Sequence, residues 1–406
     1  MGETRDVLES EIGARAVGTA VIDEREVPVA FANSEADVVR LLTLAASRNW
    51  RVTPIGSGTK IDRGVPREKP RFAISLRGYS GVTAYERGDG TLTARAGSTM
   101  AALAQVARSG GNHLTPDVAR AAHATLGGTI ASGISGIDRL RYGPLRNHVL
   151  GLRVALGDGS VVKSGGKLVK NVTGFDLHRL YTGSRGSLCV ILEASLRLFN
   201  LPEREIALQT VFFGRAAALA SARVVLASQV KPTCVAITGA LDSAWTLSIA
   251  LAGRADVLVW EEGLVRDAIG TFDRFEGELA RAKIEELRDR EAEASVHAAC
   301  LPGGLESALA RVDEISAHDD HAPHMFIHPG IASLAVEATE PTLPAHAAAL
   351  TAARARVELA HASVSTRGAF DPLAGVAPPV RRLMTDVTRA LDPVRRFAGP
   401  RAMGAV

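Results

Sequence analysis

Glycine is concentrated in one part of this 406-residue chain, and that concentration constrains the fold more than any other feature. Residues 127–186 hold 13 of the chain's 39 glycines, set between apolar runs. Glycine destabilises the interior of helices and strands, but it is favourable where the backbone turns with positive φ or lies against a ligand. The stretch from Ala124 to Leu198 therefore indicates short elements joined by glycine turns, with backbone close to a bound molecule.

Composition excludes several classes of protein. Hydrophobic residues make up 46% and charged residues 22% of the chain, as in ordinary globular proteins. Aromatic residues, at 4%, are too few for a nucleic-acid stacking platform, and a net charge of +3 is too small to favour nucleic acid or membrane as a partner. The sequence shows neither a run of about 18 apolar residues nor a secretory signal. We expect a cytoplasmic protein without a transmembrane segment. Any association with the inner face of the membrane would be peripheral and would come through partners.

Local charge and cysteine usage narrow the kind of ligand. Residues 138–186 hold nine basic and three acidic residues, a local charge of +6 that suits an anionic ligand, although most of the nine are also explained as solvated loop charges. Cys189, Cys234 and Cys300 lie far apart and form no CxxC pair, so they cannot by themselves build an iron–sulfur or zinc site. We therefore predict reduced thiols and no metal site.

The composition of the chain shifts near residues 200–203, beyond which glycine is less dense and long helices rich in Ala, Glu and Arg are expected. Residues 1–26 have the pattern of a polar arm. The next part is expected to alternate short strands and helices, with helices at 35–48 and 100–109, another beginning at Thr125, a hairpin at 149–163 and a strand at 187–198. Residues 204–406 follow the order of split βαβ units over an antiparallel sheet, with a loop at 360–377 and a last helix at 379–391.

Two familiar nucleotide motifs are absent. The segment Gly56–Ile61 lacks the third glycine of a GxGxxG fingerprint, and Gly165–Leu168 fails the P-loop pattern at both ends. Two separate loops rich in Gly, Ser and Thr remain, Thr53–Lys60 and Pro116–Ser135. Successive N–H groups in such turns form concave nests that bind pyrophosphate oxygens. Either loop alone is equally well explained as a turn, but their occurrence together with the block Gly183–Glu193 favours a nucleotide-type site.

The order of these blocks resembles the FAD-binding domain of the vanillyl-alcohol oxidase superfamily, the PCMH-type FAD-binding proteins. Pro54–Lys60 resembles its first pyrophosphate loop, and Thr115–Asp117 with Ala124–Gly128 resembles its second. The further matches, in family order, are Tyr142-Gly143, Val149–Leu152, Asp158-Gly159, Lys170–Asp176 and Gly183–Gly186. Within the superfamily, Lys167–Asp176 is similar to a stretch of the FAD-binding E subunit of glycolate oxidase. Arg396–Arg401 resembles a degraded form of the family's closing segment.

This resemblance implies an α+β fold, with a two-lobed PCMH-type FAD-binding domain at 27–203 and a ferredoxin-like α+β cap domain at 204–406. It also implies FAD as the cofactor. The residues that it assigns to FAD are Pro54, Gly56, Ser57, Gly58, Thr59, Lys60, Pro116, Asp117, Thr125, Gly127, Gly128, Ser132, Ser135, Val190 and Ile191.

The function implied is that of an FAD-binding subunit in a glycolate oxidase-like complex. Such a complex moves a hydride from Cα of a 2-hydroxy acid to flavin N5, and its partners are a catalytic D-type flavin subunit and an iron–sulfur subunit. The His-rich Gly-Asp-Gly-Asn motif of the D subunit is missing; His324 and His328 are its nearest approach, and no catalytic residue is assigned. Two alternatives stay open: a non-catalytic structural or electron-relay flavin subunit, and a stand-alone FAD-dependent alcohol or sugar oxidase.

Overall fold

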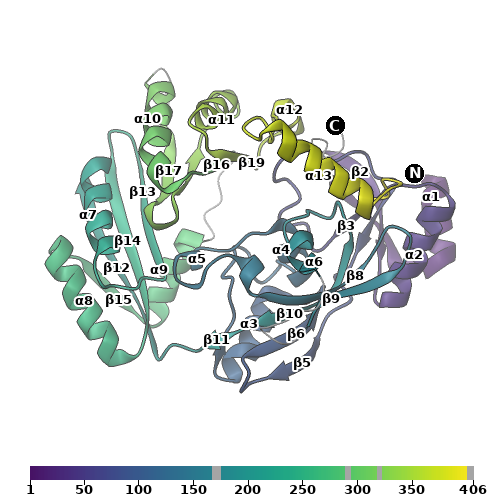
Figure 1. Ribbon diagram of the computed structural model, residues 1–406, viewed down its shortest axis with the longest axis horizontal. Helices are drawn as coiled ribbons and strands as arrows, with labels where there is room; N and C mark the ends of the chain where they lie inside the picture. Colours follow the sequence, from purple (N-terminus) through teal and green to yellow (C-terminus); the bar gives the residue numbers. More distant parts are fainter. Residues whose placement is uncertain (167–174, 289–293, 318–321, 400–406) are drawn as a thin grey trace. The chain divides into compact units, whose positions relative to one another are not determined.

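The computed structural model describes residues 1–166, 175–288, 294–317 and 322–399. Its contacts divide the chain into two compact units. Unit 1 comprises Met1–Ser135, Pro144–Leu201 and Val376–Val406, and unit 2 comprises Gly136–Gly143 and Pro202–Gly375. Each unit has a hydrophobic core of its own, and Figure 1 labels many of the elements that build them.

The first sheet of unit 1 brings parallel strands to a common edge. Its order is β1-β2-β4-β3, and the strands are β1 (Val17–Ile22), β2 (Arg25–Phe31), β4 (Phe72–Ser75) and β3 (Val52–Ile55). Strand β1 is antiparallel to β2, whereas β2 and β3 both run parallel to β4. Phe31 and Ile55 both align with Ser75, so the three strands end together. The carboxyl edge of such parallel strands is where α/β sheets bind ligands.

The second sheet of unit 1 is antiparallel and carries much of the core. Its order is β5-β6-β10-β8-β9, and the strands are β5 (Val82–Glu86), β6 (Thr91–Arg95), β10 (Val190–Arg197), β8 (Val149–Ala155) and β9 (Val161–Gly165). A short antiparallel pair joins β7 (Asn112–His113) to β11 (Phe199–Asn200). The predicted hairpin at 149–163 and the predicted strand at 187–198 are confirmed.

Three of the helices described in unit 1 begin at a hydroxyl side chain that caps them. The helices are α1 (Gly2–Ile12), η1 (Ala14–Ala16), α2 (Glu35–Ser47), α3 (Met100–Ser109), α4 (Leu126–Ser132), η2 (Leu145–Asn147), α6 (Leu177–Tyr181) and α13 (Pro378–Leu391). Ser34, Thr99 and Thr125 accept hydrogen bonds from N–H groups three residues on, as expected of N-cap residues. The predicted helices at 35–48, at 100–109 and from Thr125 are therefore confirmed.

Unit 2 repeats one βαββαβ pattern along its described residues. The first copy runs β12 (Arg204–Phe213), α7 (Arg215–Ala227), β13 (Cys234–Ala240), β14 (Ala244–Gly253), α8 (Ala255–Ile269) and β15 (Asp273–Glu276). The second runs β16 (Ser295–Ala299), α10 (Leu305–Ser316), β17 (His324–His328), β18 (Ser333–Glu337), α11 (Leu343–Ala352) and β19 (Arg356–Ala360). The remaining elements are α5 (Arg139–Tyr142), α9 (Glu278–Arg288), η3 (Pro302–Gly304), η4 (Pro329–Ile331) and α12 (Val364–Ala369).

The strand order of unit 2 is that of two ferredoxin-like modules side by side. It reads β15-β12-β14-β13-β17-β18-β16-β19, so each copy has its first and third strands in the middle and its fourth strand outermost. The copies join where β13 pairs with β17, Thr238 lying opposite Phe326. Alternate residues such as Leu247, Ile327 and Val336 face the core of this unit. The expected split βαβ order over an antiparallel sheet is confirmed.

The chain's beginning differs from the expected polar arm. Residues 2–12 form α1 and residues 17–22 form β1, and Leu8 is fully buried in the core of unit 1. Helix α1 buries only Thr4 and Leu8, one turn apart, so its apolar stripe is too narrow to give a helical period. Helix α12, residues 364–369, lies within the segment 360–377 that was expected to be a loop, and its six residues are too few to give a helical period.

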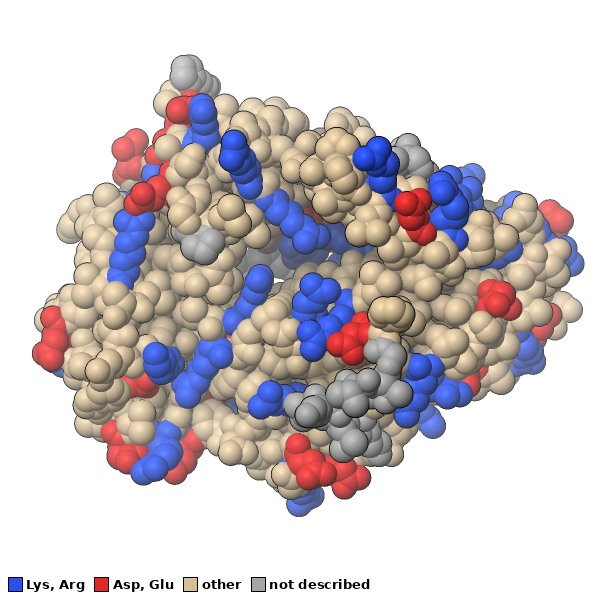
Figure 2. Space-filling model, in the orientation of Figure 1, with Lys and Arg blue, Asp and Glu red and all other residues tan. Residues whose placement is uncertain are grey.

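Surface charges are largely balanced where they meet. Arg274 pairs with Glu262 and Glu276, and Arg204 pairs with Glu276 at 3.0 Å. In the space-filling view, Asp and Glu side chains lie beside Lys and Arg at several places on the face shown (Figure 2). Within the described ranges, no helix is both long enough and apolar enough to span a lipid bilayer.

Candidate functional site

The first predicted loop leaves the carboxyl end of β3 with its backbone donors available. The N–H groups of Ser57, Gly58 and Thr59 donate to no acceptor among the residues that the structure describes. Gly58 has φ of +78°, a conformation that glycine adopts without strain. Successive unpaired N–H groups in a turn form a nest for anionic oxygens.

The second predicted loop lies directly against the first. A Cβ atom at position 56 would lie 2.0 Å from Thr125 Oγ1, so the two backbones approach as closely as they do only because residue 56 is glycine. Thr125 caps helix α4, its Oγ1 accepting the Gly128 N–H at 3.3 Å. The Leu126 N–H donates to the Ser98 carbonyl at 2.8 Å, which fixes the start of the helix on its neighbouring segment.

The third glycine block completes the cluster. The Gly183 N–H donates to the Ile130 carbonyl at 2.9 Å, and the Arg185 N–H donates to the Ala131 carbonyl at 2.7 Å. A Cβ atom at Gly186 would lie 2.8 Å from Pro54 Cγ. Three segments that are far apart in the sequence therefore meet around the end of β3 and helix α4.

Buried hydroxyls on these segments fit a site that awaits a ligand. The side-chain oxygens of Thr115, Thr129 and Ser184 are buried and have no hydrogen-bond partner within the described part of the chain. Thr115 and Thr129 are each 1% exposed and Ser184 is 5% exposed. Buried polar atoms in native proteins almost always have partners, so such atoms indicate an unfilled hydrogen-bonding role. Together with the available N–H groups, these hydroxyls suit a pyrophosphate-bearing ligand.

Lys60 ends the first loop in a cationic environment. Its ammonium lies 3.4 Å from Thr59 Oγ1. Burial, followed by the positive charges of Arg63 and Arg120, lowers the pKa of Lys60 to about 8. Arg63 and Arg120, which sequence analysis did not single out, thus join the site from the first and second loops. The sequence could have indicated these two arginines only by their position: Arg63 lies three residues after Lys60, and Arg120 lies three residues after Asp117.

The remaining predicted residues divide into three groups. Ser132 donates its hydroxyl to the Thr129 carbonyl, and the Ser135 hydroxyl accepts the Leu145 N–H, so both are engaged within the fold. Val190 and Ile191 lie in β10, are buried in the core and pair with β8. The other four predicted residues belong to the second loop. Two of them, Pro116 and Asp117, precede α4, and the other two, Gly127 and Gly128, lie within it.

Most cations of the basic segment 138–186 have their own partners. Arg153 donates to both Glu35 carboxylate oxygens, at 2.6 and 2.7 Å, and Arg179 pairs with Asp176 at 3.4 Å. Arg141, which belongs to unit 2, donates to the Ala252 carbonyl at 2.6 Å. Lys167 and Lys170 lie outside the described residues, as does most of the Lys167–Asp176 match. The local excess of positive charge therefore serves mainly the fold.

His324 and His328 are the histidines whose sequence comes nearest to the missing motif of the D subunit. Both lie in β17 of unit 2. His324 Nδ1 is 3.6 Å from Glu337 Oε2, and His328 Nδ1 is 4.0 Å from Cys234 Sγ. Burial lowers the pKa of His328 to about 4, so its imidazole stays neutral at physiological pH. Across the described ranges, no group of three or more His, Cys, Asp or Glu side chains is placed to hold a metal ion.

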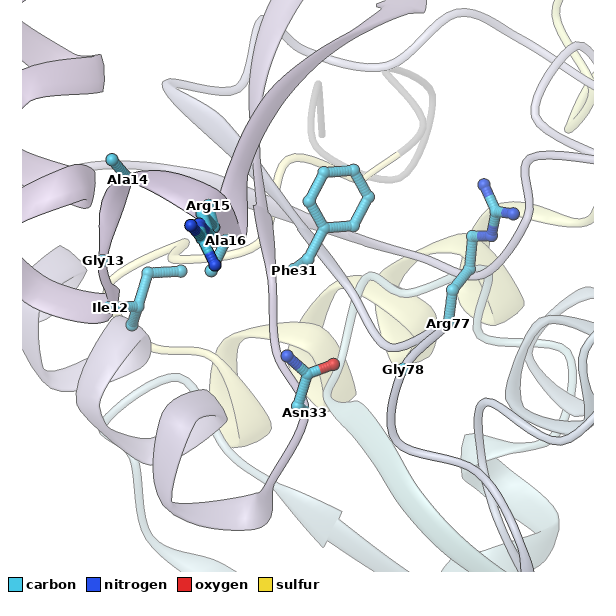
Figure 3. Close-up of a pocket in the computed structure, with 9 residues that line it drawn as sticks. All are labelled: Ile12, Gly13, Ala14, Arg15, Ala16, Phe31, Asn33, Arg77 and Gly78. Carbon is cyan, nitrogen blue, oxygen red and sulfur yellow. The ribbon is translucent and has the colours of Figure 1, made fainter.

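A cavity of about 700 Å³ opens elsewhere in unit 1. Figure 3 shows the residues that line it, among them Arg15 from the α1–β1 connection, Phe31 and Asn33 from the end of β2, and Arg77 and Gly78 after β4. Gly78 packs against Asn33, because a Cβ there would lie 1.8 Å from Asn33 Oδ1. None of the predicted cofactor residues lines this cavity.

The family comparison agrees with this geometry. Residues 28–165 match the family model described as the FAD binding domain. This part of the chain is an FAD-binding domain of the PCMH type, and FAD is the cofactor of that class. The range contains the first loop and α4 and ends at the last residue of β9.

Three curated relatives match part of the chain. The chain is 29% identical over 196 residues to "Glycolate oxidase subunit GlcD" of Bacillus subtilis (strain 168), 48% of this chain and 42% of that protein. It is 32% identical over 174 residues to "D-2-hydroxyglutarate dehydrogenase" of Xanthomonas citri pv. viticola, 43% and 37% of the two chains. "D-lactate dehydrogenase" of Archaeoglobus fulgidus is 34% identical over 176 residues, 43% and 39%. The chain spans 42% or less of the length of these three relatives.

Solved structures share the fold. A structure of alkyldihydroxyacetonephosphate synthase has a TM-score of 0.68 at 17% identity and covers 97% of this chain and 79% of that one. A structure titled "Structure of FgChi7B" has a TM-score of 0.73 at 14% identity, with 98% and 99% covered. These identities show the fold alone. The predicted α+β fold with a PCMH-type FAD-binding domain is confirmed.

Proposed function

We propose that this chain is an FAD-dependent oxidoreductase that acts on a small 2-hydroxy acid. The printed names of its relatives support the substrate class, since glycolate, D-2-hydroxyglutarate and D-lactate are all 2-hydroxy acids. Bound FAD supplies a hydride acceptor at flavin N5 for the hydride that leaves the substrate's Cα. In this proposal the residues of this chain hold the FAD that accepts the hydride from the substrate.

The close approach of the two glycine loops is the observation that carries the proposal. The N–H groups of Ser57, Gly58 and Thr59 would hold pyrophosphate oxygens, and the positive charges of Lys60 and Arg120 would offset the negative charge. The close packing of Gly56 against Thr125 fixes the first loop against the second, so the N–H donors of the first loop are already positioned before the ligand binds. Such pre-organisation lowers the entropy lost on binding.

We further propose that the chain works as the FAD-binding subunit of a glycolate oxidase-like complex. None of its three cysteines, all of them described by the structure, forms a disulfide; Cys189 belongs to unit 1, whereas Cys234 and Cys300 belong to unit 2. Burial raises the pKa of the Cys189 thiol, which disfavours the thiolate that metal binding requires. Electrons that leave the flavin would therefore pass to an iron–sulfur partner, beside a catalytic D-type flavin subunit. The word "subunit" in the name of the Bacillus relative supports such an assembly for that protein.

The test is anaerobic reduction of the chain's own flavin. Purified chain is expected to carry FAD that denaturation releases, and glycolate, D-lactate or D-2-hydroxyglutarate is expected to bleach the flavin absorbance band. Absence of flavin, together with failure to bind added FAD, would overturn the proposal. Bound FAD that no 2-hydroxy acid reduces would assign the chain to a structural or electron-relay role. Reduction followed by rapid oxygen consumption without partners would assign it to the stand-alone oxidases.

A further inference from the structure

The cavity that Figure 3 shows lies in unit 1 and has no part in the proposed function. Its volume of about 700 Å³ falls within the range of about 300–1,000 Å³ that small-molecule sites occupy. Three separate parts of the unit line it: the connection between α1 and β1, the end of β2 and the segment after β4. A space formed in this way is a candidate site for a second ligand.

Two arginines give the cavity a positive charge. The side chains of Arg15 and Arg77 both line it, and neither forms an ion pair or a hydrogen bond within the described ranges. The N–H groups of Arg77 and Gly78 also donate to no acceptor in the part of the chain that the structure describes. Guanidinium groups pair bidentately with carboxylate and phosphate oxygens, so this set of donors favours a negatively charged ligand.

Acidic side chains close in sequence do not cancel this charge. Asn33, which lines the cavity, is followed by helix α2, whose first turn carries Glu35 and Asp37. Asp37 pairs with Arg40 and Glu35 pairs with Arg153, each at 2.6 Å. Among the described residues that line the cavity there is no Asp or Glu. The two lining arginines therefore keep the cavity positive.

An aromatic ring lies between the two arginines in the view of Figure 3. It belongs to Phe31, the last residue of β2, and it packs over Gly18 of β1, where an added Cβ would lie 2.9 Å from Phe31 Cε2. The side-chain amide of Asn33 has no hydrogen-bond partner among the described residues and lines the same cavity. An aromatic ring stacks on planar groups, and an amide both donates and accepts at the edge of a base.

We propose that this cavity binds a second small molecule, a planar ring that carries a negatively charged group, and that nucleoside phosphates are the class it takes. Arg15 and Arg77 supply the positive charge for the phosphate oxygens, the Phe31 ring stacks on the base, and the Asn33 amide pairs with the edge of the base. The inference does not depend on the proposed function, because none of the predicted cofactor residues lines the cavity. Binding here would make the chain responsive to a nucleotide without use of the cofactor loops.

The experiment is calorimetric titration of the FAD-loaded chain with ADP, with adenosine and with pyrophosphate, while the flavin absorbance reports whether FAD stays bound. ADP is expected to bind at one site per chain with a dissociation constant below about 1 mM, and FAD is expected to stay bound. Adenosine lacks the charge and pyrophosphate lacks the ring, so each is expected to bind at least about tenfold more weakly than ADP.

Two variants test the two kinds of contact separately. Arg77→Met removes a guanidinium group and Phe31→Leu removes the ring, and each is expected to weaken ADP binding by about tenfold. The FAD content and melting temperature of each variant show whether it is folded. Arg87→Met is the matched control, because Arg87 is an exposed arginine of the same unit that does not line the cavity, and it should leave ADP binding unchanged.

Three results would overturn the inference: no saturable binding of ADP, ADP binding that releases FAD, or ADP binding that is unchanged in Arg77→Met. Pyrophosphate that binds as tightly as ADP, together with unchanged ADP binding in Phe31→Leu, would overturn the assignment of a ring-bearing ligand. Failure of the chain to take up FAD would instead overturn the proposed function, and the same variants would then be titrated with ADP in the flavin-free chain.

Discussion

At position 56 a single methyl group decides whether the two glycine loops can meet. A Cβ there would lie 2.0 Å from Thr125 Oγ1 and 3.2 Å from Thr125 Cβ, and Oγ1 can rotate away only by giving up the Gly128 N–H that it accepts as the helix cap. Gly56→Ala is therefore expected to separate the loops and to weaken FAD binding by about tenfold or more, at a stability cost of about 1–3 kcal/mol from overpacking. Flavin content after gel filtration and a calorimetric titration measure both effects.

Gly88→Ala provides the control for that substitution. Gly88 lies in an exposed turn where an added Cβ meets nothing within 4 Å. It should leave FAD content and thermal stability unchanged. If Gly56→Ala retained full FAD affinity, the contact between the loops would not be part of the site.

The sequence predicts the loops well and their neighbours poorly, for a physical reason. Glycine density and hydroxyl spacing are local properties, so Gly56, Ser57 and Thr125 could be identified from the sequence. The approach of Arg120 to Lys60 depends on how distant segments pack, and no local pattern carries that information. The orphaned hydroxyls of Thr129 and Ser184 are likewise visible only when burial is known.

At the scale of elements, Thr99 and Thr125 form a natural comparison. Each caps a helix of unit 1 by accepting an N–H group at 3.3 Å, and the two residues form a β-bridge with each other. Thr99→Ala and Thr125→Ala should each lower the free energy of unfolding by about 1 kcal/mol, the usual cost of a lost N-cap hydroxyl. Only Thr125→Ala should also weaken FAD binding, because only Thr125 contacts Gly56. Urea unfolding and FAD titration of both variants separate the two effects, and equal losses of FAD affinity in both would contradict this role for Thr125.

Element prediction succeeds where the period is strong and fails where elements are short. Helix α3 spans Met100–Ser109 as predicted, because buried Met100, Leu103 and Ala107 recur at helical spacing. Strand β19 spans five residues, and the last of them, Ala360, opens the segment expected to be a loop. Its place at the sheet edge depends on pairing with β16, a contact about 60 residues away in sequence.

At the scale of the whole molecule, the end of the chain returns to unit 1. The Val52 N–H donates to the Arg396 carbonyl at 2.9 Å, and Thr53 Oγ1 donates to the Ala398 carbonyl at 3.0 Å. Residues 376–399 thus brace β3 immediately before the first loop, although the sequence places them after unit 2. Sequence periodicity has no means to show this return, because the contacts join residues more than 300 positions apart.

Arg396 is the residue whose loss should release this brace. It is 4% exposed and donates to the carbonyls of Ala45 and Trp50, both at 2.7 Å. Arg396→Met would remove the donor to the Trp50 carbonyl and one of the two donors to the Ala45 carbonyl, which still accepts the Trp50 N–H, and is expected to cost about 1–3 kcal/mol. The neighbouring Arg395→Met breaks a partly exposed ion pair with Glu68 and should cost less, about 1 kcal/mol or below. Urea unfolding compares the two, and equal midpoints would show that the tail does not support β3.

The proposed complex makes a prediction of its own at this scale. Native purification of the tagged chain from its own cells is expected to recover a second polypeptide with iron and acid-labile sulfide. A tagged form with three alanines in place of the cysteines should recover the same iron, since the cluster would belong to the partner. Recovery of the chain alone, active with oxygen, would instead support the stand-alone oxidase.

The central claim is that the loops on either side of Gly56 and Thr125 form the cradle for the FAD pyrophosphate. A crystal structure of the FAD-loaded chain tests it most directly. We predict pyrophosphate oxygens at about 2.7–3.2 Å from the N–H groups of Ser57, Gly58 and Thr59, with Lys60 Nζ turned toward them. FAD bound with its pyrophosphate away from both loops would contradict the account.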